Sequence, residues 1–95
     1  MVGIGFEWSS AKAQANKKKH GITFEEAMAV FYDERALLIA DTLHSVGEDR
    51  FIILGRGKND SILVVVHLYW EERELIRIIS ARAATRKECN QYFAR

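Results

Sequence analysis

SILVVVHLYWEERELIRIISARA, residues 61–83, is the stretch that decides the fold. Its two halves are aliphatic runs of strand length, joined by the short polar turn WEERE, so we expect an antiparallel hairpin. A hairpin symmetric about Glu72 would place His67 directly opposite Arg77 on one face, where the guanidinium would keep the imidazole neutral. The aliphatic residues of the other face would then pack against the helices: Ile62, Val64, Val66 and Leu68.

The rest of the chain supplies further strands and three helices around this hairpin. Residues 2–8, 35–41 and 50–57 have strand character, and helices are predicted over 10–20, 24–33 and 86–95. Ser9 or Ser10 can cap the first helix and Gly21 can end it, while Thr23 with Glu26 and Thr85 with Glu88 have capping-box spacing. The order β-α-α-β-β-β-β-α predicts an α+β fold, in which an antiparallel meander carries the N-terminal helices on one face and a C-terminal helix.

Length and composition limit the organisation of the chain. With 95 residues, 48% of them hydrophobic, residues 1–95 are expected to form one domain. The longest apolar run is broken by His67 and is too short to cross a bilayer, and the first eight residues lack the pattern of a secretion signal. The one cysteine, Cys89, cannot form an internal disulfide. A cytoplasmic protein with no membrane partner is expected.

The charges are segregated, although the net charge is only +1. Residues 1–20 hold four lysines against one glutamate, and residues 77–95 hold five basic residues against one glutamate. Residues 21–76 hold eleven acidic and five basic residues. Basic ends of this kind fit a nucleic-acid footprint, and they equally fit a solvated surface pattern.

The polar residues favour phosphodiester chemistry without a metal or cofactor. The sequence has no CxxC, HExxH or closely spaced histidine pair, and no glycine-rich nucleotide cradle. Lysine, arginine and histidine with one or two acids can stabilise a phosphorane-like transition state and move its protons. RNA brings its own nucleophile in the 2′-OH. The structural alternative is that a strand histidine is a hydrogen-bonded core residue and a strand arginine pairs with a carboxylate.

The first helix gathers polar rather than apolar side chains on one face. Lys12, Asn16, Lys19 and His20 have the spacing i, i+4, i+7 and i+8. This face either borders a ligand, or Asn16 and His20 anchor the helix to the loop over 42–49.

Four segments together resemble the BrnT toxins of bacterial type II toxin–antitoxin systems. They are FEWSSAKAQANKKKHGITFEEA (6–27), HSVGEDR (44–50), LVVVH (63–67) and IRIISARAATRKE (76–88). The resemblance implies a RelE-like fold and a ribonuclease that arrests growth. It also implies a BrnA-like antitoxin partner, through which alone the complex contacts operator DNA. The family usually has Asp directly after the tryptophan, where this chain has Ser9, which can still cap the helix.

The resemblance also marks the candidate site residues. The family's recurring polar positions fall on Lys12, Asn16, Lys19, His20, Glu48, Arg50, His67, Arg77, Ser80 and Arg82. Of these, the catalytic candidates are His20, Glu48, Arg50, His67 and Arg77, with the histidines and Glu48 as proton carriers. The RNA-binding candidates are Lys12, Lys19, Ser80 and Arg82.

Two function classes remain open from the sequence. One is a metal-independent endoribonuclease toxin that cuts RNA; the other is a non-catalytic module that holds a DNA-binding antitoxin. A proton carrier favours the enzyme, because phosphate binding alone needs none. In both classes the aromatic residues near strand and helix ends are candidate antitoxin anchors: Tyr69, Trp70 and Tyr92.

Overall fold

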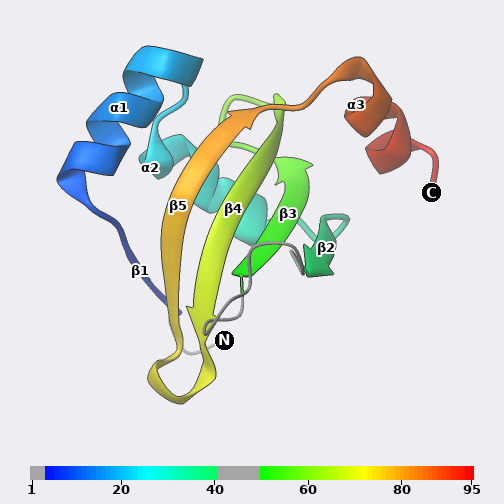
Figure 1. Ribbon diagram of the computed structural model, residues 1–95. Helices are drawn as coiled ribbons and strands as arrows, with labels where there is room; N and C mark the ends of the chain where they lie inside the picture. Colours follow the sequence, from blue (N-terminus) through cyan, green and yellow to red (C-terminus); the bar gives the residue numbers. More distant parts are fainter. Residues whose placement is uncertain (1–3, 41–49) are drawn as a thin grey trace.

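A computed structural model describes residues 4–40 and 50–95, which form a five-stranded sheet flanked by helices (Figure 1). The strands are β1 (Gly5–Glu7), β2 (Leu37–Ala40), β3 (Arg50–Arg56), β4 (Ile62–Trp70) and β5 (Leu75–Ala83). The helices are α1 (Ser10–His20), α2 (Phe24–Ala27) and α3 (Arg86–Phe93), with 3₁₀ turns η1 (Met28–Tyr32) and η2 (Glu71–Arg73). The α+β class predicted from the sequence is confirmed.

The sheet has the order β1-β5-β4-β3-β2. Strands β2 to β5 form the expected antiparallel meander, in which each strand pairs with the next one along the chain. β1 joins the far edge beside β5 and runs parallel to it, so the sheet is mixed rather than wholly antiparallel. The chain between β1 and β2 is long enough for this arrangement because it holds α1, α2 and η1.

The residues predicted to begin and end the helices cap them in the structure. Ser9 caps α1 by accepting a hydrogen bond from the Lys12 amide, and Gly21 ends the helix with φ of 73°. Thr85 and Glu88 form a complete capping box at the start of α3. The second helix is shorter than predicted, since its α-helical part ends at Ala27 and the chain continues as η1.

Each face of the sheet has its own hydrophobic cluster. On one face, α2 and η1 bury Phe24, Ala27 and Val30 against side chains of β3, β4 and β5. On the other face, α3 buries Tyr92 against a smaller group: Leu54, Ile62 and Val64. The hydroxyl of Tyr92 donates a 2.6 Å hydrogen bond to Asp33, which fastens α3 to the segment before β2. Because α3 has only eight residues, it covers one part of its face, and no other helix of the described residues covers the rest.

The β4–β5 hairpin differs from the predicted register. Trp70 pairs with Leu75, so the turn is four residues long and its centre lies after Glu72. His67 therefore pairs with Ile78, and Arg77 pairs with Leu68 on the opposite face. The predicted opposition of His67 and Arg77 is wrong. The aliphatic face, predicted to pack against the helices, packs against α3 at Ile62 and Val64 and not against the N-terminal helices. The face bearing Leu63, Val65 and His67 packs there instead.

Further along the hairpin, β5 contains a β-bulge. The register passes from the pair His67 and Ile78 to the pair Val66 and Ser80, which leaves Ile79 as an extra residue in β5. Simple alternation would put Arg77 and Ser80 on opposite faces. The bulge brings them to the same face, together with Arg82.

Candidate active site

A row of charged residues crosses the face of the sheet that carries α3. The register aligns Arg50 of β3 with Leu68 of β4, Leu68 with Arg77 of β5, and Arg77 with Glu7 of β1. Paired residues lie on one face, so the two arginines flank the leucine. Neighbouring strands are about 4.8 Å apart, which places the Arg50 and Arg77 backbones about 10 Å from each other. Two long guanidinium side chains can meet one phosphate group from this separation.

Arg77 has a carboxylate partner. Its Nη1 donates a 2.7 Å hydrogen bond to Oε2 of Glu7, and both side chains are about one-third exposed. Partly exposed ion pairs contribute little to stability and can be rearranged by a competing anion. The structural alternative considered for a strand arginine therefore applies to Arg77, although its side chain remains within reach of a ligand on this face.

Arg82 lies further along β5 and binds a second carboxylate. Its Nη1 and Nη2 donate hydrogen bonds of 2.8 and 2.9 Å to the two oxygens of Glu88. This hydrogen-bonded pair lowers the pKa of Glu88 to about 2. Since Glu88 also belongs to the capping box of α3, Arg82 connects the end of the sheet to the helix.

A groove between α1 and β5 brings together the helix face and the strand. It is lined by Lys12, Lys19 and His20 from α1 and by Ile79 and Ser80 from the bulged part of β5. The lysines and His20 are exposed, whereas Ser80 is half-buried. Residues about 60 positions apart in the sequence are therefore adjacent, and Ser80 connects this groove to the face that holds Arg77 and Arg82.

Asn16 holds the helix in this position. Its amide Nδ2 donates hydrogen bonds of 2.8 Å to the Ala81 carbonyl and 3.0 Å to the Ile22 carbonyl, and its Oδ1 accepts a 3.0 Å bond from the Ala81 amide. The side chain is buried. β1 pairs with β5 only as far as Arg77, so Asn16 supplies at Ala81 the two hydrogen bonds that a neighbouring strand would make. Asn16 thus anchors α1 to β5, and the loop over 42–49, the predicted anchor, lies outside the described residues.

His67 lies on the other side of the sheet from the arginines. It is only 3% exposed and packs against the rings of Phe31 and Phe51, whose centroids lie 4.7 and 5.9 Å from its own. Its Nδ1 lies 3.4 Å from the Val65 carbonyl oxygen. Burial lowers the pKa of His67 to about 4, so the imidazole is neutral at pH 7, through desolvation rather than through Arg77.

The structure therefore separates the predicted site residues into two groups. One face and its border hold the basic residues of the candidate set together with Ser80: Lys12, Lys19, His20, Arg50, Arg77, Ser80 and Arg82. His67 belongs to the opposite, aromatic side. Glu48 lies outside the described residues. Within the described ranges, no three His, Cys, Asp or Glu side chains gather as a metal site would require, and no helix is long and apolar enough to cross a membrane.

Comparison with known families matches this sequence from residue 8 to residue 88. The matching family is described as "Ribonuclease toxin, BrnT, of type II toxin-antitoxin system". The chain belongs to the BrnT family. The resemblance inferred from four sequence segments is confirmed, and membership of a toxin–antitoxin family implies an antitoxin protein as the partner of this BrnT chain.

The BrnT fold is also seen in a solved structure. The chain is similar to the crystal structure of the Brucella abortus ribonuclease toxin BrnT, with a TM-score of 0.68 and 22% sequence identity. The match covers 88% of this chain and all of the Brucella chain. At this identity the likeness concerns the fold. A comparison with curated protein sequences gave no match.

Two residues of this BrnT chain that matter to the site geometry were missed or misplaced by the sequence reasoning. Glu7 had no assigned role, because its partner Arg77 is 70 residues away and β1 joins β5 only in the folded chain. Asn16 was noticed through its helix spacing, but its partner Ala81 could not be predicted without the strand order.

Proposed function

We propose that the chain is a metal-independent endoribonuclease toxin that cleaves RNA, arrests growth and is neutralised by a BrnA-like antitoxin. The observation that carries the proposal is the convergence of the α1 groove and the Arg50–Arg77 row on adjoining parts of one surface. A segment of RNA lying over Ser80 would meet cations from three directions. The fold is inferred to be RelE-like, and the site of action is inferred to be the cytoplasm, where RNA is available.

The proposed reaction is an internal transfer within RNA. The 2′-OH attacks the adjacent phosphorus, a base accepts its proton, the P–O5′ bond breaks, and an acid gives a proton to the 5′-oxygen. Arg50 and Arg77 would stabilise the charge that accumulates on the phosphoryl oxygens. His20, which is exposed in the groove, is the proposed proton carrier on the described surface, and Glu48 is retained from the family resemblance alone.

His67 is left out of the proposed catalytic set. It is buried on the opposite face, and a group that cannot reach the phosphate cannot move its protons. The products of the reaction as written are a 2′,3′-cyclic phosphate and a free 5′-hydroxyl.

The non-catalytic alternative has one observation in its favour. Arg77 and Arg82 are each paired with a carboxylate of the same chain, as expected for arginines with a structural role. In that case the chain would hold a DNA-binding antitoxin without cutting RNA.

One experiment separates the two functions. The chain is expressed with and without the protein encoded beside it, and RNA incubated with purified toxin is analysed for its ends, with and without a chelator. We expect growth arrest without the partner, and cyclic phosphate ends whose yield is unchanged by the chelator. Intact RNA and continued growth despite soluble, folded protein would support the non-catalytic function.

A further inference from the structure

Exposed apolar side chains lie on β2, at the edge of the sheet, and around a pocket beside it. Five large hydrophobic residues are substantially exposed in the described part of the chain, and two of them, Leu38 and Ile39, lie on β2. Two more, Tyr32 and Tyr69, line a pocket together with Leu38. Leu38 is 62% exposed and Tyr32 is 56% exposed. Large apolar groups grouped in this way are costly in water and typically mark a binding surface.

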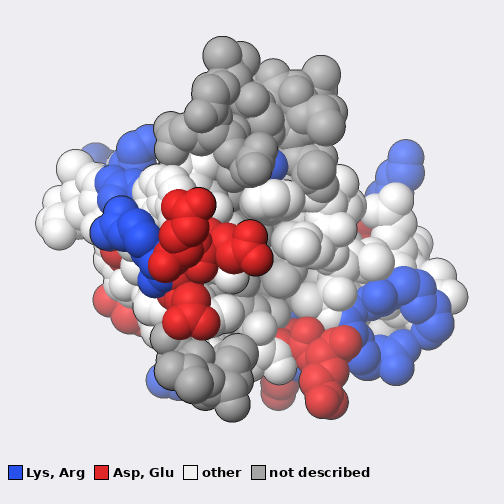
Figure 2. All heavy atoms as spheres, turned by 90° about the horizontal axis from the view of Figure 1, so that it is seen from below, with Lys and Arg blue, Asp and Glu red and all other residues white. Residues whose placement is uncertain are grey.

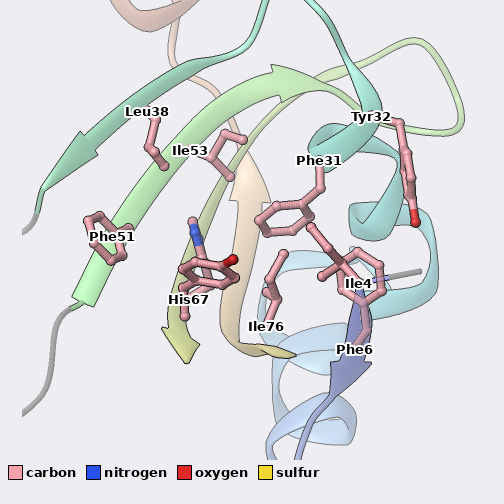
Figure 3. Close-up of a pocket in the computed structure, with 10 residues that line it drawn as sticks. Ile4, Phe6, Phe31, Tyr32, Leu38, Phe51, Ile53, His67 and Ile76 are labelled. Carbon is pink, nitrogen blue, oxygen red and sulfur yellow. The ribbon is translucent and has the colours of Figure 1, made fainter. Parts of the chain in front are cut away.

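Tyr32, Leu38 and Tyr69 line an aromatic pocket. The pocket lies on the face of the sheet that carries α2 and η1 (Figure 3). The pocket has a volume of about 210 Å³, with Phe31, Phe51 and the buried His67 among its lining residues. Sites for small molecules are typically about 300–1,000 Å³, so this pocket suits one or two side chains better than a cofactor. We call Tyr32, Leu38, Phe51 and Tyr69, together with the outer backbone edge of β2, the edge surface.

The backbone of β2 offers a second means of recognition. β2 is the last strand of the sheet, and no strand in the described ranges pairs with its outer edge. Leu38 pairs with Ile53 and Ile39 with Ile52, so β2 presents one exposed side chain on each face. An extended peptide could add to this edge by main-chain hydrogen bonds and place an apolar side chain in the pocket.

Charge distinguishes the kinds of partner that this surface fits. Beside the pocket lies a second hollow, which shares Phe51 and Tyr69 with it and is also lined by Glu71 and Glu72. Figure 2 shows acidic side chains gathered at this end of the molecule, with basic side chains directly beside them. Carboxylates repel the phosphates of RNA, whereas they attract a peptide that carries lysine or arginine. If a second copy of the chain bound here through the same surface, its acidic residues would approach and repel Glu71 and Glu72.

We propose that the edge surface binds an extended, basic and apolar segment of the antitoxin, which adds to β2 as a sixth strand. The proposal rests on the proposed function in so far as the partner is the antitoxin of a toxin–antitoxin pair. The surface is separate from the Arg50–Arg77 row, because the pocket opens on the opposite face. The antitoxin would thus be anchored on one face of the sheet, and the two arginines would be reached from the other face.

Binding of the full-length toxin to the antitoxin encoded beside it tests the proposal. The variant Leu38→Asp is compared with Phe93→Asp, because Phe93 is similarly exposed at 59% but lies on α3. Glu72→Lys is compared with Glu25→Lys, an exposed glutamate of α2. We expect Leu38→Asp to weaken the dissociation constant at least about tenfold and Glu72→Lys about threefold at low salt, with both controls within about twofold of the parent.

Two further measurements complete the test. Hydrogen exchange should show protection of the amides of residues 37–40 when antitoxin is added, as a new strand requires. Purified Leu38→Asp should cleave RNA as the parent does. Equal affinity of Leu38→Asp and Phe93→Asp would overturn the proposal, and so would a toxin dimer that Leu38→Asp dissociates. Failure of the isolated parent to cleave RNA would refute the proposed function and leave the binding result standing.

Discussion

The side-chain amide of Asn16 and the backbone of Ala81 form a closed pair of hydrogen bonds, of 2.8 and 3.0 Å. The pair occupies the edge of β5 beyond the end of β1, two residues after the bulge at Ile79. It fixes α1 against β5 and thereby sets the distance between the helix lysines and Ser80. A structural contact thus defines the geometry of the candidate site.

Replacement of Asn16 should destabilise the whole domain. In Asn16→Ala the buried N–H and C=O of Ala81 lose their partners, so we expect a loss of about 2–3 kcal/mol in the free energy of unfolding. Asn16→Asp should also destabilise, because a carboxylate faces the Ala81 and Ile22 carbonyls. Urea unfolding measures both. Gln14→Ala, at an exposed position of the same helix, should change stability by less than about 0.5 kcal/mol.

The buried His67 should make stability depend on pH. Its pKa is about 4 in the folded chain and about 6.5 when unfolded, so between these values the unfolded state binds a proton that the folded state does not. Stability from this residue is complete above pH 6.5 and falls as the pH decreases toward 4, by on the order of 3 kcal/mol. His67→Gln should lack this part of the pH dependence in urea unfolding at pH 7 and 4.5. His20→Gln, which changes an exposed histidine, should retain it.

The same variant tests the exclusion of His67 from catalysis. Purified His67→Gln, once shown to be folded at pH 7, should cleave RNA at a rate similar to the parent, because the residue lies on the opposite face from the arginines. A loss of more than about 100-fold in folded protein would return His67 to the active site.

The positive charge of Arg77 should contribute more to cleavage than its ion pair with Glu7 does. Arg77→Ala removes a cation from the proposed transition-state site, and we expect cleavage to slow by about 100-fold. Glu7→Gln breaks the same ion pair but leaves the guanidinium in place, so its cleavage rate should stay within a few-fold of the parent. Single-turnover rates on one RNA compare the two variants. If both slow cleavage equally, the ion pair is the important feature and Arg77 has a structural role.

Glu88 should oppose RNA binding while it supports α3. Glu88→Gln weakens the bidentate contact with Arg82 and the capping box, so we expect a loss of about 1 kcal/mol in stability. The released Arg82 guanidinium should bind RNA more tightly, measurable as a lower dissociation constant at low salt. Gln91→Ala, at an exposed position of α3, serves as the control. Unchanged RNA affinity in Glu88→Gln would remove Arg82 from the RNA-binding surface.

Local sequence signals determined most of the secondary structure. The caps at Ser9, Gly21 and Thr85 act through neighbours three or four residues away, so they could be predicted from spacing. The aliphatic runs identified β3, β4 and β5 in the same way, because strand character depends on local composition and alternation. The family resemblance depended on order and spacing of residues, and the sequence contains both.

Which side chains share a face was decided by the tertiary structure. A turn one residue longer than assumed moved Arg77 away from His67, and the bulge at Ile79 then brought Ser80 and Arg82 to the face of Arg77. Side chains alternate with a period of two, so a shift of one residue reverses every assignment along a strand. The turn and the strand beyond the bulge contact segments that are far away in the sequence, because Glu74 accepts a hydrogen bond from the Gly5 amide and Ala81 is bonded to Asn16. The sequence by itself thus determined the elements and the candidate residues, and only the folded sheet decided which of them can act on the same phosphate.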